Sequence, residues 1–280
     1  MATAYKINDF LIGGNAITSG IYLLEGTEYA PALAPRRAVI EIPTVHYAIP
    51  QWNDPLSQVT VALTLRVVDV TPEGLASRWN TLMGLLGMGT NQPITLTRVR
   101  GTIEETAEAQ LVSMNTPDFS CPSDRADATI IFNVPGGAWR GAQTDVTFFN
   151  SSSNVLANAL ASTVPIVDPL LLLAGPATSL TVTDNTSATT VFWGDGSSTV
   201  GSGQWLLIDP RYMRARIHTS ESWSLTTGTN VTGALEFRGN GPLTFTSRGS
   251  GVFGNRTGTF TVTTAGGNNG VQVRSKYAVI

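Results

Sequence analysis

The segment VTVALTLRVVDVTPEGLASRWNTLMGLLG, residues 59–87, decides how the first half of the chain is expected to fold. Apolar residues in its first part alternate with polar or small ones, at Val59, Val61, Leu63, Leu65 and Val67. A period of two is typical of a strand that buries one of its faces. The segment therefore predicts a long, half-buried strand that ends near Val68.

An amphipathic helix is predicted directly after this strand. Thr71 is a suitable N-cap, Pro72 suits the first helical position, and Glu73 favours the positive end of a helix. The apolar residues that follow recur at spacings of three and four: Leu75, Trp79, Leu82, Met83 and Leu86. Gly87 and Gly89 are expected to end the helix. One helix is therefore predicted over residues 72–88.

Further strands surround this strand–helix pair. The pattern predicts them at residues 10–12, 21–24, 39–42, 94–99, 107–114 and 128–134. Prolines at positions 31, 35, 43, 50 and 55 interrupt the early part, which indicates long loops or an extended arm. A single helix among many strands indicates a mainly β chain whose first domain, residues 1–150, is of the α+β type.

The chain changes character near Asn150. Residues 144–163 are rich in Ser, Asn and Ala, so residues 151–163 are assigned to a linker and residues 164–280 to a second domain. Short strands, and no helix, are predicted there at residues 180–183, 190–193, 204–209, 214–218, 233–238 and 243–247. The turn pairs Asp195-Gly196 and Asn240-Gly241 complete a spacing that favours a jelly-roll β-sandwich. Strands at 260–264 and 271–277 are expected to form an added C-terminal hairpin.

The composition indicates a protein that is covered in part by other chains. Charged residues make up 13% of the 280 residues, about half the usual share for a globular protein. Residues 1–150 hold 14 acidic and 9 basic residues, whereas residues 151–280 hold 6 and 8. Neither half has the strongly basic balance of a nucleic-acid-binding protein.

The cysteine content and the N-terminus favour a reducing cytoplasm. Cys121 is the sole cysteine, so no intrachain disulfide is expected. The first residues lack the basic and apolar regions of a signal peptide. No apolar run approaches the length of a membrane span, so no membrane insertion is expected.

Motifs that carry out chemistry are missing from the sequence. There is no nucleophile elbow, phosphate-binding loop or dinucleotide fingerprint. His46 and His218 lack the spacing of a zinc site, and packing or surface roles are favoured for both. Glu104 and Glu105 are adjacent, so on a strand they point to opposite faces and do not form a catalytic pair. The sequence therefore predicts no enzyme, no metal site and no cofactor.

Aromatic residues of the second domain are the remaining candidates for a ligand contact. Trp193, beside the Gly194–Gly196 turn, is the candidate sugar contact, because an exposed Trp on a β-sandwich can stack on a sugar ring. Trp205 alternates with Leu207, which favours burial. Trp223 has no feature that separates it from a core residue.

Other polar residues of the second domain are given structural roles. Asp195 lies in a turn, and Asp209 precedes a proline. A basic cluster is formed by Arg211, Arg214 and Arg216. It is interpreted as a solvated strand edge, because no base-stacking aromatic pattern accompanies it.

Several motifs occur in an order that is similar to that of a known family. They are the strand Val59–Val68, the helix Pro72–Gly87, the strand after Pro93, Phe119-Ser-Cys-Pro, Gln204-Trp-Leu-Leu-Ile-Asp209, Ser222-Trp-Ser-Leu-Thr-Thr-Gly-Thr-Asn230 and Glu236-Phe-Arg. Together they cover most of residues 1–247. In this order they resemble the distal tail protein of long-tailed siphophages, the hub of the tail tip.

The resemblance implies a fold, an assembly and a set of partners. It implies a ring, usually a hexamer, formed by N-terminal domains, and a galectin-like C-terminal β-sandwich that serves as a docking platform. Such a ring continues the tail tube and lets DNA pass without specific binding. Tube protein, tape measure and tail-tip or receptor-binding proteins are the implied partners, in a virion tail assembled in the bacterial cytoplasm.

Two alternatives remain open at this point. One is another ring-forming phage tail subunit, such as the tube protein, although a tube protein normally has a single domain. The other is a carbohydrate-binding β-sandwich module, for which Trp193 is the candidate contact. An enzyme is the least favoured reading of the sequence.

Overall fold

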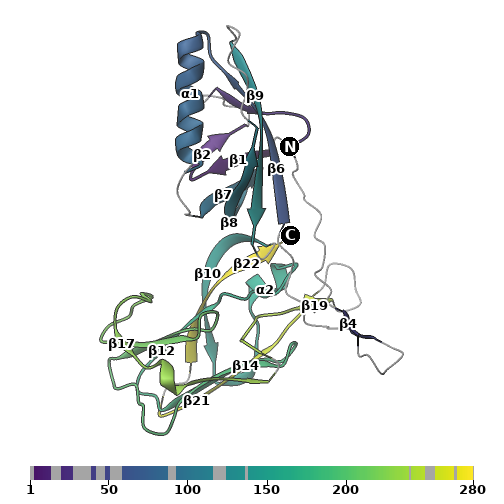
Figure 1. The fold of residues 1–280 in the computed structure, drawn as a ribbon. Coiled ribbons are helices and arrows are strands. Elements are labelled where there is room, and N and C mark those ends of the chain that lie inside the picture. Colours follow the sequence, from purple (N-terminus) through teal and green to yellow (C-terminus); the bar gives the residue numbers. More distant parts are fainter. Residues whose placement is uncertain are drawn as a thin grey trace. The chain divides into compact units, whose positions relative to one another are not determined.

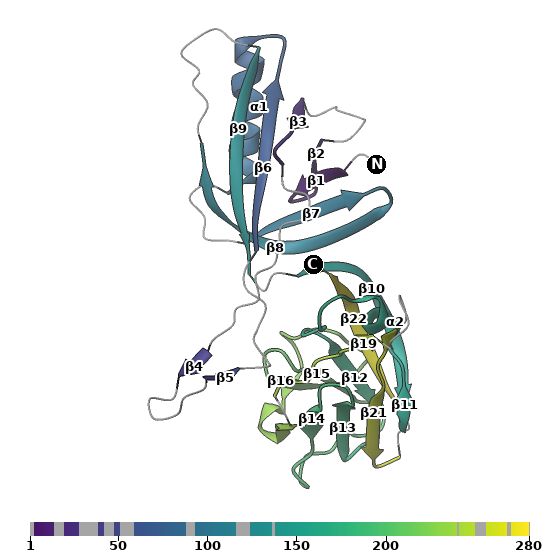
Figure 2. The ribbon, with the colours of Figure 1, turned by 90° about the vertical axis from the view of Figure 1, so that its right-hand side faces the viewer.

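The protein consists of two compact units, Met1–Gly141 and Ala142–Val279. The structure is a computed structural model, and it describes residues 3–13, 20–27, 39–41, 48–50, 59–87, 93–115, 124–135, 138–239, 241–249, 256–267 and 270–279. Both units are built mainly of strands, as predicted (Figures 1 and 2). The units divide at Gly141, whereas the sequence placed a boundary at residue 150.

The N-terminal unit contains a helix among strands. Its elements are β1 (Thr3–Ile7), β2 (Phe10–Ile12), β3 (Ile21–Leu23), β6 (Val59–Val68), α1 (Pro72–Leu85), β7 (Ile94–Arg100), β8 (Ile103–Met114), β9 (Arg125–Val134) and the start of β10 (Trp139–Phe149). Strands β4 (Val39–Glu41) and β5 (Ala48–Pro50) form a separate antiparallel pair. The rest of the predicted arm around Pro31–Pro55, like His46 and the Phe119 motif, lies outside the described residues.

Strand β8 joins the two sheets of this unit. Its first part, from Ile103 to Ala109, pairs with β7, which continues through β1 to β2. Its last part, from Gln110 to Met114, pairs with β9, which continues through β6 to β3. A register shift between Leu111 and Ser113 lies within the second part. Because a bulge bends a strand and increases its twist, β8 can take part in both sheets.

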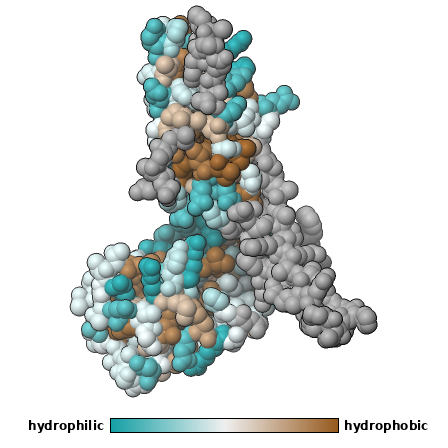
Figure 3. Space-filling view, viewed as in Figure 1, coloured by the Kyte–Doolittle hydropathy of each residue, from teal (hydrophilic) through white to brown (hydrophobic). Residues whose placement is uncertain are grey.

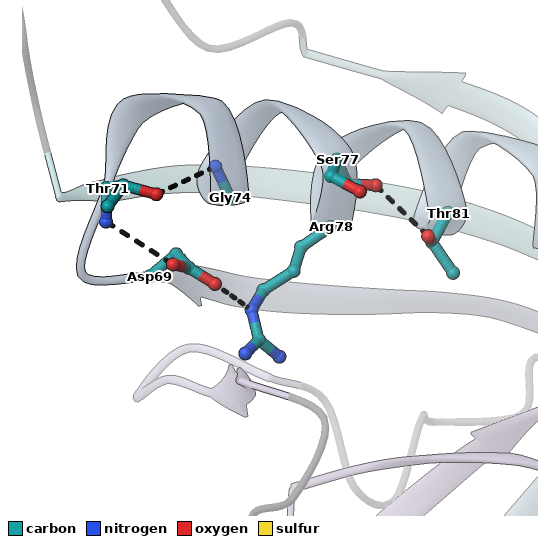
Figure 4. A network of polar contacts seen from close by, with 6 residues as sticks. All are labelled: Asp69, Thr71, Gly74, Ser77, Arg78 and Thr81. Carbon is teal, nitrogen blue, oxygen red and sulfur yellow. Dashed lines mark hydrogen bonds and ion pairs between the residues drawn. The ribbon is translucent and has the colours of Figure 1, made fainter.

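Helix α1 begins at the cap that the sequence predicts (Figure 4). The Thr71 hydroxyl accepts a hydrogen bond from the backbone N–H of Gly74 at 3.1 Å. Asp69 accepts a bond from the Thr71 N–H at 3.3 Å and from Arg78 Nε at 2.5 Å. The Arg78 hydrogen bond lowers the pKa of Asp69. Two features of the segment before the helix, a capping hydroxyl and a carboxylate, therefore set its start.

The helix packs one side against β6 and ends three residues before the predicted 88. Its buried side chains are Leu75, Trp79 and Leu82, which recur at the predicted spacing. Leu86 caps the end, and its N–H donates to the Leu82 carbonyl. Apolar periodicity thus identified the buried side correctly, because a helix on a sheet buries one stripe.

A buried ion pair lies between β7 and β8. Arg98 and Glu105 are directly opposite each other in the register. Their side chains are 1% and 3% exposed, and Arg98 Nε donates to Glu105 Oε2 at 2.5 Å. Arg100 Nη2 donates to the same oxygen at 2.6 Å. The Arg98 guanidinium also lies 4.7 Å from the ring of Trp139. Burial lowers the pKa of Arg98, and Glu105 supplies the compensating charge.

Glu104 faces the other side of the sheet, which confirms the predicted divergence of the two adjacent glutamates. It accepts a bond from Lys6 Nζ at 2.6 Å, and its side chain is 51% exposed. The two carboxylates therefore have different environments although they are neighbours in the sequence.

The C-terminal unit is a sandwich of two sheets. One sheet has the order β17-β16-β15-β12-β22-β10 and the other β11-β21-β13-β14-β18. The strands are β11 (Ser151–Asn154), β12 (Leu170–Ala174), β13 (Ser179–Asp184), β14 (Thr189–Trp193), β15 (Trp205–Asp209), β16 (Arg214–His218), β17 (Thr229–Asn230), β18 (Leu235–Gly239), β21 (Phe260–Ala265) and β22 (Gly270–Val279). A two-stranded sheet is formed by β19 (Arg248–Gly249) and β20 (Arg256–Thr257).

Three phenylalanines from distant parts of the chain meet in the core of the sandwich. Phe260 stacks on Phe148 with ring centroids 5.6 Å apart, and it meets Phe245 edge-on at 4.7 Å. All three side chains are buried. Phe245 belongs to the segment 243–247, which makes a single bridge to Ile166 in place of the predicted strand. These contacts join β10 and β21 through the interior.

The predicted C-terminal hairpin is wrong. Strand β21 pairs with β13 and β11 in the five-stranded sheet. Strand β22 pairs with β12 in the other sheet. β21 and β22 are therefore integral strands, one in each layer. Two strands separated by a Gly-Asn turn look like a hairpin in sequence, because local pattern does not specify the pairing partner.

The segment assigned to a linker also contains regular structure. Residues 151–154 form β11, and Ala157–Ala161 form the short helix α2, in a half predicted to have no helix. Asn158 Nδ2 donates to the carbonyl oxygen of Ser275 at 2.9 Å. Polar composition suggested a linker, but this asparagine is buried and bonded to β22.

Replacing Glu105 by Gln is expected to lower the free energy of unfolding by about 3–5 kcal/mol, because Arg98 would keep a buried, uncompensated charge. Glu104→Gln is the matched control and should change stability by less than about 1 kcal/mol, since its pair with Lys6 is exposed. Urea unfolding followed by fluorescence measures both. Equal effects would contradict a special role for the buried pair.

Candidate functional site

The outer face of the six-stranded sheet gathers most of the residues that the sequence singled out in the second half. The register places Trp205 opposite His218, Leu207 opposite Arg216, and Asp209 opposite Arg214. Alternate residues such as Leu206 and Ile208 are buried on the core side. Side chains that share this outer side are Trp205, Leu207, Asp209, Arg214, Arg216 and His218. On the neighbouring strands Leu172 and Arg274 continue the same side.

Residues 219–228 form a loop that lies over this outer face. The ring of Trp223 stacks on the guanidinium of Arg274 with 4.0 Å to the ring centroid. Arg216 Nη1 donates to the carbonyl oxygens of Thr227 and Gly228. Although they point away from the core, Leu172 and Leu207 are fully buried. The loop therefore gives this part of the sheet a cover of its own.

Asp145 holds Arg274 in place beneath Trp223. Arg274 Nε and Nη2 donate to the two carboxylate oxygens of Asp145 at 2.9 and 2.7 Å. The Arg274 hydrogen bond lowers the pKa of Asp145 and raises that of Arg274. A bidentate pair fixes the plane of the guanidinium, on which the indole ring lies.

The turn between β15 and β16, residues 210–213, projects from the end of this face. Asp209 Oδ1 accepts hydrogen bonds from the N–H groups of Arg211 and Tyr212 at 3.1 and 3.3 Å. Asp209 is buried, and burial raises its pKa. The sequence gave Asp209 a structural role, and these bonds define it: its carboxylate shapes the turn.

The basic cluster occupies this turn and the strand after it. Arg211 and Arg214 place their guanidiniums 5.0 and 5.4 Å from the ring centroid of Tyr212. Both arginines are exposed, as expected for a strand edge, whereas Arg216 is half-buried under the loop. The sequence predicted no aromatic partner for this cluster. The structure shows that Tyr212, which lies between Arg211 and Arg214 in the sequence, contacts both guanidiniums.

His218 is a packing residue. It is buried, and a Cβ added at Gly228 would lie 2.8 Å from its ring. Its Nε2 has no hydrogen-bond partner among the described residues. Across the parts of the chain that the structure describes, no three His, Cys, Asp or Glu residues are close enough to hold a metal ion. In the same parts no helix has the length and apolarity needed to cross a membrane.

Trp193 lies in the core, so the structure corrects its interpretation as a sugar contact. It is 0% exposed and stands on the inner side of β14, opposite Leu180 and Leu235. Alternation with Val191 predicts this side. The neighbouring Asp195 accepts bonds from the N–H groups of Ser197 and Ser198, which hold its pKa well below the ordinary value.

Trp193→Ala is expected to lower the free energy of unfolding by about 3–5 kcal/mol, because it leaves a large cavity. Trp223→Ala is the control and should cost clearly less, since Trp223 is only half-buried. Thermal unfolding distinguishes the two. An unchanged melting temperature of Trp193→Ala would contradict the buried position.

Asp145→Asn is expected to lower stability at pH 7 by no more than about 1 kcal/mol, because the pair with Arg274 is partly exposed. The pKa of Asp145 is lowered from 3.8 in the folded protein. Its contribution is therefore present above pH 3.8 and is lost as the pH falls through the lowered pKa. Melting curves from pH 7 to pH 2 measure the difference. A difference that stays constant over this range would contradict an electrostatic cause.

Comparison with known proteins identifies solved structures with a similar fold. No family model and no curated protein matches the sequence. Among solved structures, the Dit protein of phage SPP1, described as a paradigm of the hub adsorption apparatus in phages that infect Gram-positive bacteria, matches with a TM-score of 0.64. The identity is 12%, and the match covers 99% of each chain.

Baseplate structures of phage P2 also match, at TM-scores of 0.48 and 0.47 with 11% identity. They cover 98% and 97% of both chains, respectively. The comparison of folds rests here on the SPP1 protein. Both units of this chain, from first to last strand, have the fold of the Dit hub protein of phage SPP1, as the resemblance of the sequence predicts.

Proposed function

We propose that this protein is the distal tail hub of a long-tailed bacteriophage. The observation that carries the proposal is the likeness to a phage hub protein over 99% of both chains. A likeness confined to one unit would fit a tube protein or an isolated binding module equally well. Because both units match in one chain, the hub is favoured over both alternatives. Its role is structural.

The surface of the N-terminal unit supports assembly of this unit into a ring. Apolar side chains are exposed on it at Leu11, Val70, Ile103 and Val112. Figure 3 shows a hydrophobic patch on the visible face of this unit, in the region of β1 and β2. An exposed apolar patch of this kind is typical of a surface that contacts other chains. The chain is also poor in charge, which suits a subunit with covered sides.

The charge of the N-terminal half suits a passage for DNA. Residues 1–150 hold 14 acidic and 9 basic residues. Carboxylates repel phosphates, so a ring wall of this kind lets DNA slide without holding it. We propose that the ring continues the tail tube.

The C-terminal unit serves, in this proposal, as the platform for other tail proteins. The tube protein, the tape measure and the receptor-binding apparatus are the proposed neighbours, and the location is the tail tip of the virion. Its outer face carries exposed Arg and Tyr side chains, which are common in protein interfaces. No sugar-binding role is proposed, since Trp193 is in the core.

The expected state of the purified chain in low-salt buffer is a ring, usually of six subunits. Light scattering coupled to gel filtration measures the mass, and negative-stain electron microscopy shows whether the particle has a central channel. Leu11→Asp combined with Val112→Asp is expected to convert the ring to a monomer without unfolding it, because both side chains are exposed. A parent chain that stays monomeric at high concentration would sink the proposal.

A further inference from the structure

The turn between β15 and β16 carries a group of large, exposed side chains. We call Arg211, Tyr212, Met213 and Arg214 the tip. Tyr212 and Met213 are 56% and 50% exposed. Two-strand turns usually carry Gly, Asn, Asp or Ser, whose side chains are small and polar. Large Tyr and Met side chains in this place leave apolar surface in water.

Met213 adopts a strained backbone conformation in addition to being exposed. Its backbone has a φ of 51°, in the left-handed region. A residue with a Cβ is strained in this conformation, whereas glycine adopts it freely. A side chain that is retained at a strained, exposed position contributes nothing to the core. Such an outlier points to a function of the side chain itself.

The tip is also held rigid from below. The buried carboxylate of Asp209 accepts the backbone N–H groups of Arg211 and Tyr212. Arg211 Nη1 lies 3.8 Å from a carboxylate oxygen of Asp168. The two guanidiniums flank the Tyr212 ring. A preordered surface loses little conformational entropy when it binds, so this tip is built for contact with another surface.

The chemistry of the tip defines its partner. Tyr, Met and Arg are the residue types enriched in the cores of protein interfaces. Arg214 is exposed and makes no ion pair among the described residues, so its guanidinium can bind a carboxylate bidentately. The partner therefore combines carboxylates with apolar side chains.

Strand β8 offers such a surface on the N-terminal unit of another copy. Glu108 lies between the buried residues Ala107 and Ala109 and is exposed on the outward side of the strand. Val112, further along the same strand, is 61% exposed. We propose that the tip of one copy docks on the outward side of β8 of a second copy. The contact rests on the proposed ring, in which several copies are neighbours.

Charge reversal and charge exchange test the contact in the full-length chain. Arg214→Glu is expected to raise the protein concentration at which half of the assembly dissociates by about tenfold or more, because like charges would meet. Adding Glu108→Arg to this variant should restore most of the lost association between copies. Arg238→Glu is the matched control: Arg238 is an exposed arginine stacked on Phe192 in the other sheet. It should leave association unchanged.

A second substitution separates docking from folding. Met213→Gly is expected to raise the melting temperature, because glycine relieves the left-handed strain, and to weaken association at the same time. A purely structural turn residue would not give this opposite pair of effects. Association is measured by sedimentation of the assembly at decreasing protein concentration. If dilution does not dissociate the assembly, its dissociation is measured as a function of urea concentration instead.

The outcomes distinguish this contact from the ring. Weaker assembly for Arg214→Glu, with recovery by Glu108→Arg, supports the contact. A ring whose dissociation is the same for parent, Arg214→Glu and Met213→Gly overturns the contact and leaves the ring standing. Weakening by Arg214→Glu without recovery excludes β8 as the partner surface and also overturns the proposal. A parent that is monomeric under all conditions overturns both the contact and the ring.

Discussion

The buried pair of Arg98 and Glu105 is the interaction on which the N-terminal unit depends. It fixes the register of β7 on β8, because a slip by one residue would place the two charges on opposite sides of the sheet and leave one of them buried without its partner. Strand β8 then continues into the second sheet and positions β9 and β6. Since β6 leads directly into α1, the register of one strand pair determines where the helix lies. A buried charge pair adds little net stability, but it penalises every alternative pairing.

In the C-terminal unit, apolar contacts between distant segments of the chain hold the two sheets together. Phe148, Phe245 and Phe260 come from separate parts of the chain and meet between the two sheets. The outer side of the six-stranded sheet then carries the polar chemistry, with Arg274 held by Asp145 and covered by Trp223. The turn at its end is shaped by Asp209. Support from below holds an exposed group of Arg, Tyr and Met in one arrangement.

Local patterns in the sequence predicted elements well and their partners poorly. The strand at 59–68 and the cap at Thr71 follow from alternation and from a hydroxyl, and both are found. The pairing of β21 and β22 was wrong, because the Gly-Asn turn between them is equally compatible with a hairpin and with a crossing between sheets. The helix at Ala157–Ala161 was missed, because five residues are too few to show a period. For the site, the arginines were recognised but not the role of Tyr212.

The sequence by itself determined the mainly β content, the helix that begins at Pro72, the absence of a catalytic motif and the order of motifs that resembles a phage hub protein. These properties depend on residues that are close together in the sequence, because hydrophobic periodicity and helix capping are local effects. Only the tertiary structure decided that Trp193 is in the core, that Glu105 is buried against Arg98 while Glu104 is exposed to water, and that Trp223 covers Arg274. Those outcomes depend on which strands pair across long distances in the chain, and side-chain burial is a property of that pairing.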